Sequence, residues 1–194
     1  MFLATSELIK EIDHNKIIDI VSPDDIQGAS IDLRIGEKAK ILKQQSSPID
    51  LSKKPNFEEF YENIELSKGI ELKAGEFMYS ETVEYIKVPK DKAALLLPRS
   101  SLARMGLILP SSFYANPGYE GHLPIVIHNM SNSSFIIPPY YKVMQMLLVE
   151  LRGEAKQYHQ QIDVKFFKES NITPPRTDAN IDTDKLLEKL KKYE

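Results

Sequence analysis

The chain has 194 residues, 42% of them hydrophobic and 27% charged, with no cysteine and a formal net charge of −3 at pH 7. This length predicts one domain with a core large enough to be stable without covalent or metal cross-links. The missing cysteine excludes disulfides, thiolate metal sites and a cysteine nucleophile. A slightly acidic chain lacks the basic surface that coats nucleic acid, and no apolar run approaches the roughly 20 residues that span a membrane, so we expect a cytoplasmic protein with neither partner.

The first quarter of the chain predicts one helix followed by strands. Residues 6–13 place leucine and isoleucine side chains on one helical face, and the apolar run at residues 17–21 predicts a short strand. In residues 28–36 apolar and charged side chains alternate between two glycines, which predicts a half-buried strand that ends at the second glycine. Residues 38–54 predict another strand and a polar loop.

The rest of the chain predicts a β-rich fold. Residues 55–68 are acidic and aromatic, and they form either a short helix or an ordered insertion. Short apolar runs separated by turn residues predict strands at 70–72, 76–79, 85–88, 93–97, 123–127, 134–137 and 143–151. Many short strands with few helices are typical of an all-β sandwich or barrel.

The composition changes near the C-terminus. Residues 171–184 are rich in proline, asparagine, threonine and aspartate, and leucines at residues 184–193 follow a helical pattern. We therefore expect residues 1–161 to form the β domain and residues 162–194 to form a tail or arm that ends in a short amphipathic helix.

The histidines do not predict a metal site. No two of the four have the i, i+4 spacing of a helical zinc site, and no cysteine is present to complete one. The sequence also lacks the signature of zinc-dependent nucleobase deaminases. We expect no bound metal, and any deamination by this chain would proceed without zinc.

The densest polar cluster, RSSLARMG at residues 99–106, follows an apolar strand. One exposed helical turn at this point would present free backbone N–H groups to a ligand, with Arg99 and Arg104 on either side of Ser100 and Ser101. Phosphate is the ligand that this combination favours. The alternative is a capped surface turn with two solvated arginines.

A second segment, residues 115–123, combines Asn116, Pro117, two glycines and Tyr119. The glycines lie three residues apart around the tyrosine, which predicts a tight hairpin whose backbone approaches a flat ligand while the tyrosine stacks on a ring. The alternative is an ordinary β-turn.

Three segments taken in order resemble the dCTP deaminase and dUTPase superfamily: residues 30–36, 99–106 and 116–121. The resemblance runs from the N-terminal helix to about Gln161. The helix and residues 158–161 are more similar to the deaminase branch. It implies a distorted β-barrel or jelly-roll subunit of the dUTPase-like type and a homotrimer with active sites shared between subunits. It also implies dCTP or dUTP as the ligand, with Mg²⁺ carried by the nucleotide phosphates.

The resemblance assigns roles to eight positions of this sequence. It implies that one motif holds the phosphates, namely Arg99, Ser100, Ser101 and Arg104. It implies that the second segment receives the deoxyribose and pyrimidine, namely Asn116, Gly118 and Tyr119, and that Gln161 closes over the nucleotide. The candidate catalytic residues are Ser100, Arg104 and Asn116.

The sequence departs from the family at two positions. Deaminases of the family carry a proton-relaying glutamate where this chain has Val126. The dUTP pyrophosphatases carry an aspartate that acts as general base where this chain has Asn116. Neither side chain here takes a proton at neutral pH. Glu120 and His122 are the nearest candidates to replace them. Three readings stay open: a dCTP deaminase, a dUTP pyrophosphatase, and a non-catalytic dCTP or dUTP sensor.

Overall fold

The computed structural model describes residues 1–53, 55–110, 112–161, 168 and 172–173. The helical elements are α1 (Thr5–Asn15), η1 (Pro23–Asp25), η2 (Leu51–Lys53), η3 (Phe57–Phe60), α2 (Ser100–Arg104) and η4 (Tyr158–Gln160). The strands are β1 (Ile26–Gln27), β2 (Ser30–Leu42), β3 (Tyr61–Glu65), β4 (Ile70–Leu72), β5 (Phe77–Lys87), β6 (Lys92–Pro98), β7 (Leu107–Ile108), β8 (Tyr114–Ala115), β9 (Glu120–Asn129), β10 (Phe135–Ile137) and β11 (Lys142–Glu150). In this part of the chain no helix is long and apolar enough to cross a membrane.

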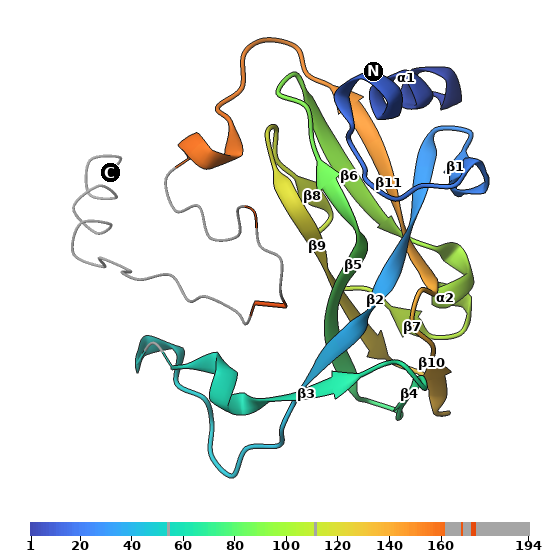
Figure 1. Ribbon diagram of the computed structural model, residues 1–194. Coiled ribbons are helices and arrows are strands. Elements are labelled where there is room, and N and C mark those ends of the chain that lie inside the picture. The colour runs from blue at the N-terminus through green and yellow to red at the C-terminus, as the bar shows by residue number, and fades with distance from the viewer. Residues whose placement is uncertain (54, 111, 162–167, 169–171, 174–194) are drawn as a thin grey trace, which may run out of the picture.

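The strands form one large curled sheet and one small ribbon. The large sheet has nine strands with the main order β7-β9-β5-β2-β11-β6-β8, while β1 and β3 pair with β2, and β10 pairs with β4 in the ribbon. The sheet curls into an open half-barrel with α1 across one end (Figure 1). The predicted all-β class with short helices is confirmed.

The long strand β2 joins two predicted elements. Its core-facing side chains are fully buried, namely Ile31, Leu33 and Ile35. The prediction that it ends at Gly36 is wrong, because the strand continues to Leu42 and takes in the strand expected after residue 38. A side chain at Gly36 would lie 3.3 Å from the Glu81 carbonyl oxygen, so this glycine lets β2 approach β5 where their register shifts.

The strand β5 likewise replaces two expected strands, at residues 76–79 and 85–88. The polar residues between them suggest a break, yet three are buried: Ser80, Thr82 and Glu84. The Ser80 hydroxyl donates to the Lys38 carbonyl at 2.5 Å, and the Thr82 hydroxyl donates to the Glu84 carbonyl at 2.8 Å. Because these groups find partners inside the fold, the strand passes through without a turn.

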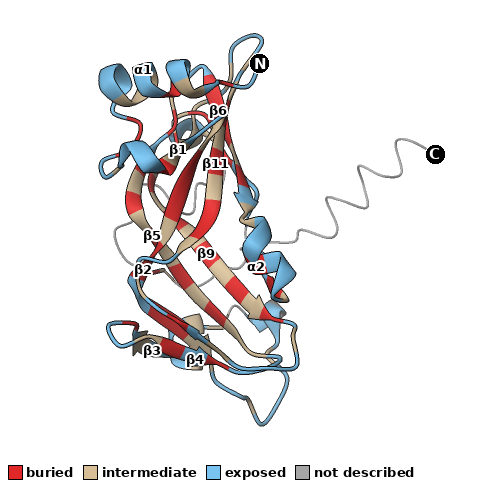
Figure 2. Ribbon diagram, turned by 90° about the vertical axis from the view of Figure 1, so that its right-hand side faces the viewer, coloured by how far each residue is buried: buried red, intermediate tan, exposed pale blue. Residues whose placement is uncertain are grey.

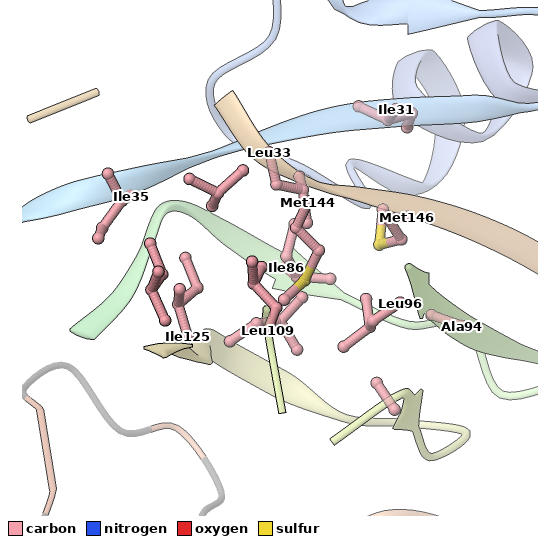
Figure 3. Packing of buried hydrophobic residues seen from close by; sticks show 14 of the residues in the cluster. Ile31, Leu33, Ile35, Ile86, Ala94, Leu96, Leu109, Ile125, Met144 and Met146 are labelled. Atoms are coloured by element: carbon pink, nitrogen blue, oxygen red, sulfur yellow. The ribbon is translucent and has the colours of Figure 1, made fainter. Parts of the chain in front are cut away.

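The hydrophobic core fills the concave side of the half-barrel. Leu33, Ile86, Ile125 and Met144 come from four different strands and point toward one another (Figure 3). Buried and partly exposed residues alternate along β5 and β9, so one face of each strand packs into this core (Figure 2). Fully burying one such side chain contributes about 1.5–3 kcal/mol, which makes this cluster the main source of stability.

Two further predictions need correction or completion. Residues 17–21 are not a strand: Ile17 and Ile18 are buried in the core, but only Ile18 pairs, through one bridge to Ile86. The left-handed conformation of Lys16 turns the chain immediately before them. Residues 55–68 contain the short helix η3 and then β3, so both readings of that segment hold in part. The helix expected at residues 184–193 lies outside the described residues.

Candidate active site

A cavity of about 360 Å³ lies between β5, β9, β8 and the turn η4. Its walls are mostly aromatic and apolar, with Phe77 and Tyr79 on one side and Tyr119 and Tyr158 on another. This size and lining are typical of small-molecule sites, in which a few polar groups orient the ligand. The cavity is therefore the candidate active site.

One face of β9 forms the floor of the cavity. His122, Pro124 and Val126 line it, while Ile125 and Ile127 point into the core and are fully buried. The predicted alternation, with Val126 facing opposite to its two neighbours, is confirmed. The site therefore presents an apolar side chain at residue 126.

Asn116 and Tyr119 reach the cavity from a tight turn. The Tyr119 N–H donates to the Asn116 carbonyl at 3.0 Å, and Gly118 adopts a φ of 73°, which fits a type II β-turn. The expected hairpin is wrong, because β8 before the turn pairs with β6, whereas β9 after it pairs with β5 and β7. The alternative of an ordinary β-turn is what the structure contains.

Contacts with the segment after β11 fix this turn. The Gln161 side-chain amide donates to Asn116 Oδ1 at 3.2 Å, so these two predicted residues do lie together. The Tyr119 ring lies 5.5 Å from the Tyr158 ring, and its hydroxyl donates to the His122 carbonyl at 2.6 Å. These contacts hold Tyr119 largely buried at the cavity wall.

Glu81 is a cavity residue that the sequence analysis did not single out. Among the described residues that line the cavity, it carries the only carboxylate. It lies on β5 opposite Pro124, two residue pairs along from the pair of Tyr79 and Val126 and on the same face. Only the strand register brings residues 81 and 126 together, since they are far apart in sequence.

The two replacement candidates lie in different places. His122 lines the cavity, and its Nδ1 lies 2.9 Å from the Thr82 carbonyl, so this nitrogen carries the proton of that hydrogen bond. Glu120 does not line the cavity and forms ion pairs with Lys87 at 3.7 Å and Lys168 at 3.3 Å.

The phosphate-type motif forms the predicted exposed helical turn. Arg99 precedes α2, Ser100, Ser101 and Arg104 are exposed, and Leu102 anchors the turn in the core. Gly106, with a φ of 81°, follows it in the expected left-handed conformation. None of the four polar residues lines the cavity, and α2 and η4 lie on opposite sides of the curled sheet (Figure 1). Within one chain the two predicted halves of the site are apart.

Next to α2 lies a charged cluster, formed by Asp25, Asp32, Arg34, Glu84 and Lys142. The Arg34 guanidinium donates to Asp25 at 2.5 Å and to Glu84 at 2.9 Å, and the Arg34 backbone N–H also donates to Glu84. Lys142 lies 2.8 Å from Asp25 and 3.5 Å from Asp32. All three carboxylates are buried, and each has a cationic partner.

This charged cluster also positions the start of α2. Arg99 Nη1 lies 3.5 Å from Asp32 Oδ2, and the Arg99 backbone N–H donates to the Val143 carbonyl at 3.0 Å. Gln145 donates to the other oxygen of Asp32 at 3.2 Å. Arg99 therefore connects the start of α2 to the charged cluster, and it also lies next to the serines of α2.

Two carboxyl groups of the cluster have shifted pKa values of opposite sign. Burial raises the pKa of Asp25, but hydrogen bonds from Arg34, Lys142 and the Ser22 backbone outweigh burial and lower it to about 2. Burial raises the pKa of Glu84, and its bonds to Arg34 offset only part of that effect. The ionised form of Asp25 is thus strongly favoured in the folded protein.

Comparison with known proteins identifies the family to which this chain belongs. Residues 2–151 match the model of the dCTP deaminase-like family, and the chain belongs to that family. It is 32% identical over 192 residues to a dUMP-forming dCTP deaminase of Nanoarchaeum equitans, which covers 89% of this chain and 96% of the relative. A dCTP deaminase of Caldivirga maquilingensis is 28% identical over 178 residues, covering 91% of this chain and 96% of that protein.

A solved structure agrees with this assignment at the level of the fold. The crystal structure of the 2′-deoxycytidine 5′-triphosphate deaminase from Agrobacterium tumefaciens matches with a TM-score of 0.63 at 21% identity and covers 76% of this chain. This chain spans 47% of that protein. The predicted family resemblance is confirmed, while the roles of individual residues and the boundary at residue 161 stay predictions.

Proposed function

We propose that the protein is a zinc-independent dCTP deaminase that takes the magnesium complex of dCTP as substrate and forms dUTP. The observation that carries this proposal is the apolar cavity, which brings Asn116, Tyr119 and Val126 together in a chain of the dCTP deaminase-like family. Two of its relatives are named dCTP deaminases.

The cavity suits a pyrimidine nucleoside. A flat ring fits between aromatic walls such as Tyr79 and Tyr119, and the Asn116 amide supplies both a donor and an acceptor for a polar edge. Gly118 does not itself line the cavity, but its positive φ, which a residue without Cβ takes without strain, forms the turn that places Asn116 and Tyr119 there. We assign the base and the deoxyribose to this cavity.

The triphosphate is assigned to α2. Its exposed serines and Arg104 offer hydroxyl, backbone N–H and guanidinium donors to phosphate oxygens, and Mg²⁺ arrives with the nucleotide. Because α2 lies away from the cavity of its own chain, a complete site needs α2 from a neighbouring subunit.

An exposed apolar surface supports this arrangement. Leu97, Met105, Ile108 and Met130 surround α2 and are all exposed in the single chain. Clustered apolar surface of this kind marks an interface with another protein. We propose a homotrimer whose active sites each combine the cavity of one subunit with α2 of the next.

A second reaction is favoured by one observation. Val126 leaves the cavity floor without an acid at the position where family deaminases carry one, which suits cleavage of dUTP to dUMP and diphosphate. The Nanoarchaeum equitans relative is named a dUMP-forming dCTP deaminase, so its name joins dUMP formation to deamination of dCTP. Asn116 weighs against this reading, because an amide orients a water but takes no proton from it.

Product analysis tests the proposal. Purified protein is incubated with Mg²⁺ and either dCTP or dUTP, and dUTP, dUMP and diphosphate are separated by chromatography while binding is followed by calorimetry. The proposal predicts conversion of dCTP to dUTP. Formation of dUMP from dUTP alone would establish the second reaction instead, and tight binding of both nucleotides without product would show a non-catalytic protein.

A further inference from the structure

The cavity contains a carboxylate beside the position where the family acid is missing. Glu81 lines the cavity from β5 and pairs with Pro124, while Val126 pairs with Tyr79. Residues 81 and 126 are thus diagonal neighbours on the same face of an antiparallel pair. Such neighbours lie about 7–8 Å apart, within reach of a long side chain. The glutamate on β5 therefore reaches the space above Val126.

The backbone around Glu81 fixes where its side chain points. Along β5 the buried residues Met78 and Ser80 alternate with Tyr79 and Glu81, which line the cavity. The register between β5 and β9 shifts between Glu81 and Tyr85, yet this alternation continues unbroken, so Glu81 keeps the facing of Tyr79.

The residues across from Glu81 fit the same geometry. Pro124 has no backbone N–H to donate, and it is tolerated in a central strand at the edge of this register shift. On the other neighbouring strand, Gly36 leaves room for the Glu81 carbonyl, 3.3 Å from where a Cβ would stand. Strands on both sides thus fix the backbone of Glu81, and a fixed backbone is the basis for presenting its side chain to the cavity.

We infer that Glu81 is the proton-transferring residue of this enzyme, in place of the glutamate that the family carries at position 126. The inference rests on the proposed function, since it requires dCTP in the cavity. Glu120 lies outside the cavity, whereas Glu81 lines it, and its diagonal position beside Val126 makes Glu81 the candidate base. His122 also lines the cavity, but it pairs with Tyr85 beyond the register shift.

The proton transfers balance as follows for dCTP and water. The Glu81 carboxylate takes a proton from water as the water oxygen bonds to C4 of the cytosine, and it passes that proton to ring N3. It then takes the proton of the new C4 hydroxyl and gives it to the amino nitrogen. The C4–N bond breaks, its electron pair leaves on nitrogen as ammonia, and C4 becomes a carbonyl. The products are dUTP and ammonia, and Glu81 is a carboxylate again.

The test compares Glu81→Gln, the double variant Glu81→Gln with Val126→Glu, and Glu71→Gln, an exposed glutamate on β4 that serves as the control. Each full-length protein is assayed for dCTP binding by calorimetry and for deamination across a range of pH. We expect Glu81→Gln to bind dCTP like the parent and to lose about 10²- to 10⁴-fold in turnover, together with the acid limb of the pH profile. The double variant should regain deamination, and the control should match the parent.

The outcomes separate this inference from the proposed function. If Glu81→Gln deaminates dCTP as fast as the parent, the inference is wrong and the proposed function stands. If Glu81→Gln no longer binds dCTP, Glu81 has a binding role and the inference is also wrong. If the parent binds dCTP but forms no dUTP, the proposed function fails, and the inference fails with it.

Discussion

Two glutamates on β5, Glu81 and Glu84, lie three residues apart and have opposite surroundings. Glu84 is fully buried in the charged cluster and accepts hydrogen bonds from both the backbone and the guanidinium of Arg34. Glu81 faces the cavity across from Pro124. One strand serves both regions because residues three apart in a strand point to opposite faces, and the alternation of buried and partly exposed residues continues unbroken along β5.

The charged cluster and the cavity differ in what surrounds their polar side chains. In the charged cluster every carboxylate has a cationic partner, so removing one leaves a buried charge uncompensated and lowers stability. In the cavity the polar groups are few and the walls are apolar, so removing one changes binding or turnover while the fold remains. Variants in the two regions should therefore separate into stability effects and functional effects.

The largest expected effect is on stability, at Asp25. Asp25→Asn should lower the free energy of unfolding by about 3–5 kcal/mol, because it leaves the buried charges of Arg34 and Lys142 without one of their partners. Urea denaturation measures the change. The matched control is the exposed neighbour Asp24→Asn, which should shift stability by less than about 0.5 kcal/mol. Equal losses in both variants would contradict the role of the charged cluster.

The next effect is on binding, at Arg104. Arg104→Ala should weaken binding of dCTP and dUTP by about 2–5 kcal/mol, the usual cost of leaving a desolvated phosphate charge without its partner. Stability should change little, because Arg104 is exposed in the single chain. Calorimetry with Arg152→Ala as the exposed control decides the matter. Parental affinity in the Arg104 variant would show that α2 is not the phosphate site.

A smaller effect is the pH dependence of stability. The pKa of Asp25 is about 2 in the folded protein and near 3.8 when the residue is unperturbed, so its contribution is present above about pH 4 and is lost as the pH falls toward 2. The difference corresponds to about 2 kcal/mol. Unfolding measured across this range should show that loss in the parent and not in Asp25→Asn. Parallel curves for the two proteins would contradict it.

The smallest effect separates two glycines with similar backbone. Gly118 and Gly75 have φ values of 73° and 79°, so alanine at either position should cost about 1–2 kcal/mol in stability. Only at Gly118 would the new Cβ meet a neighbour beside the cavity, 2.5 Å from Gln157 Oε1, whereas nothing lies within 4 Å at Gly75. Weaker dCTP binding should therefore appear for Gly118→Ala alone. Equal losses of dCTP binding in the two variants would show that this turn is not part of the binding site.

Local patterns in the sequence predicted the parts of the fold that depend on one face of one element. The alternation of Ile31, Leu33 and Ile35 and the opposite facing of Val126 follow from strand geometry alone, and the structure bears out both. The exposed turn of α2 also followed from local signals, because a strand, a polar turn and Gly106 mark its limits.

The remaining features depend on partners far along the chain. The buried Thr82 and Glu84 looked like a break in a strand, because their hydrogen-bonding partners come from the fold and from Arg34 on β2. Glu81 was missed because its place beside Val126 depends on the register between β5 and β9. No spacing within a single segment carries that information. Glu81 could be found by pairing the predicted strands and looking for acidic residues opposite residues 123–127.

The central claim is that one binding site combines the cavity of one subunit with α2 of another. The most direct measurement co-expresses Arg104→Ala and the cavity-filling Val126→Trp under different tags, isolates the mixed oligomers by both tags, and titrates them with dCTP. Each variant alone should bind no nucleotide. In a mixed cyclic trimer about one site in three joins an intact cavity to an intact α2, so we predict about one nucleotide bound per trimer. Mixed oligomers that bind no nucleotide, or a protein that stays monomeric at micromolar concentration, would contradict the shared site.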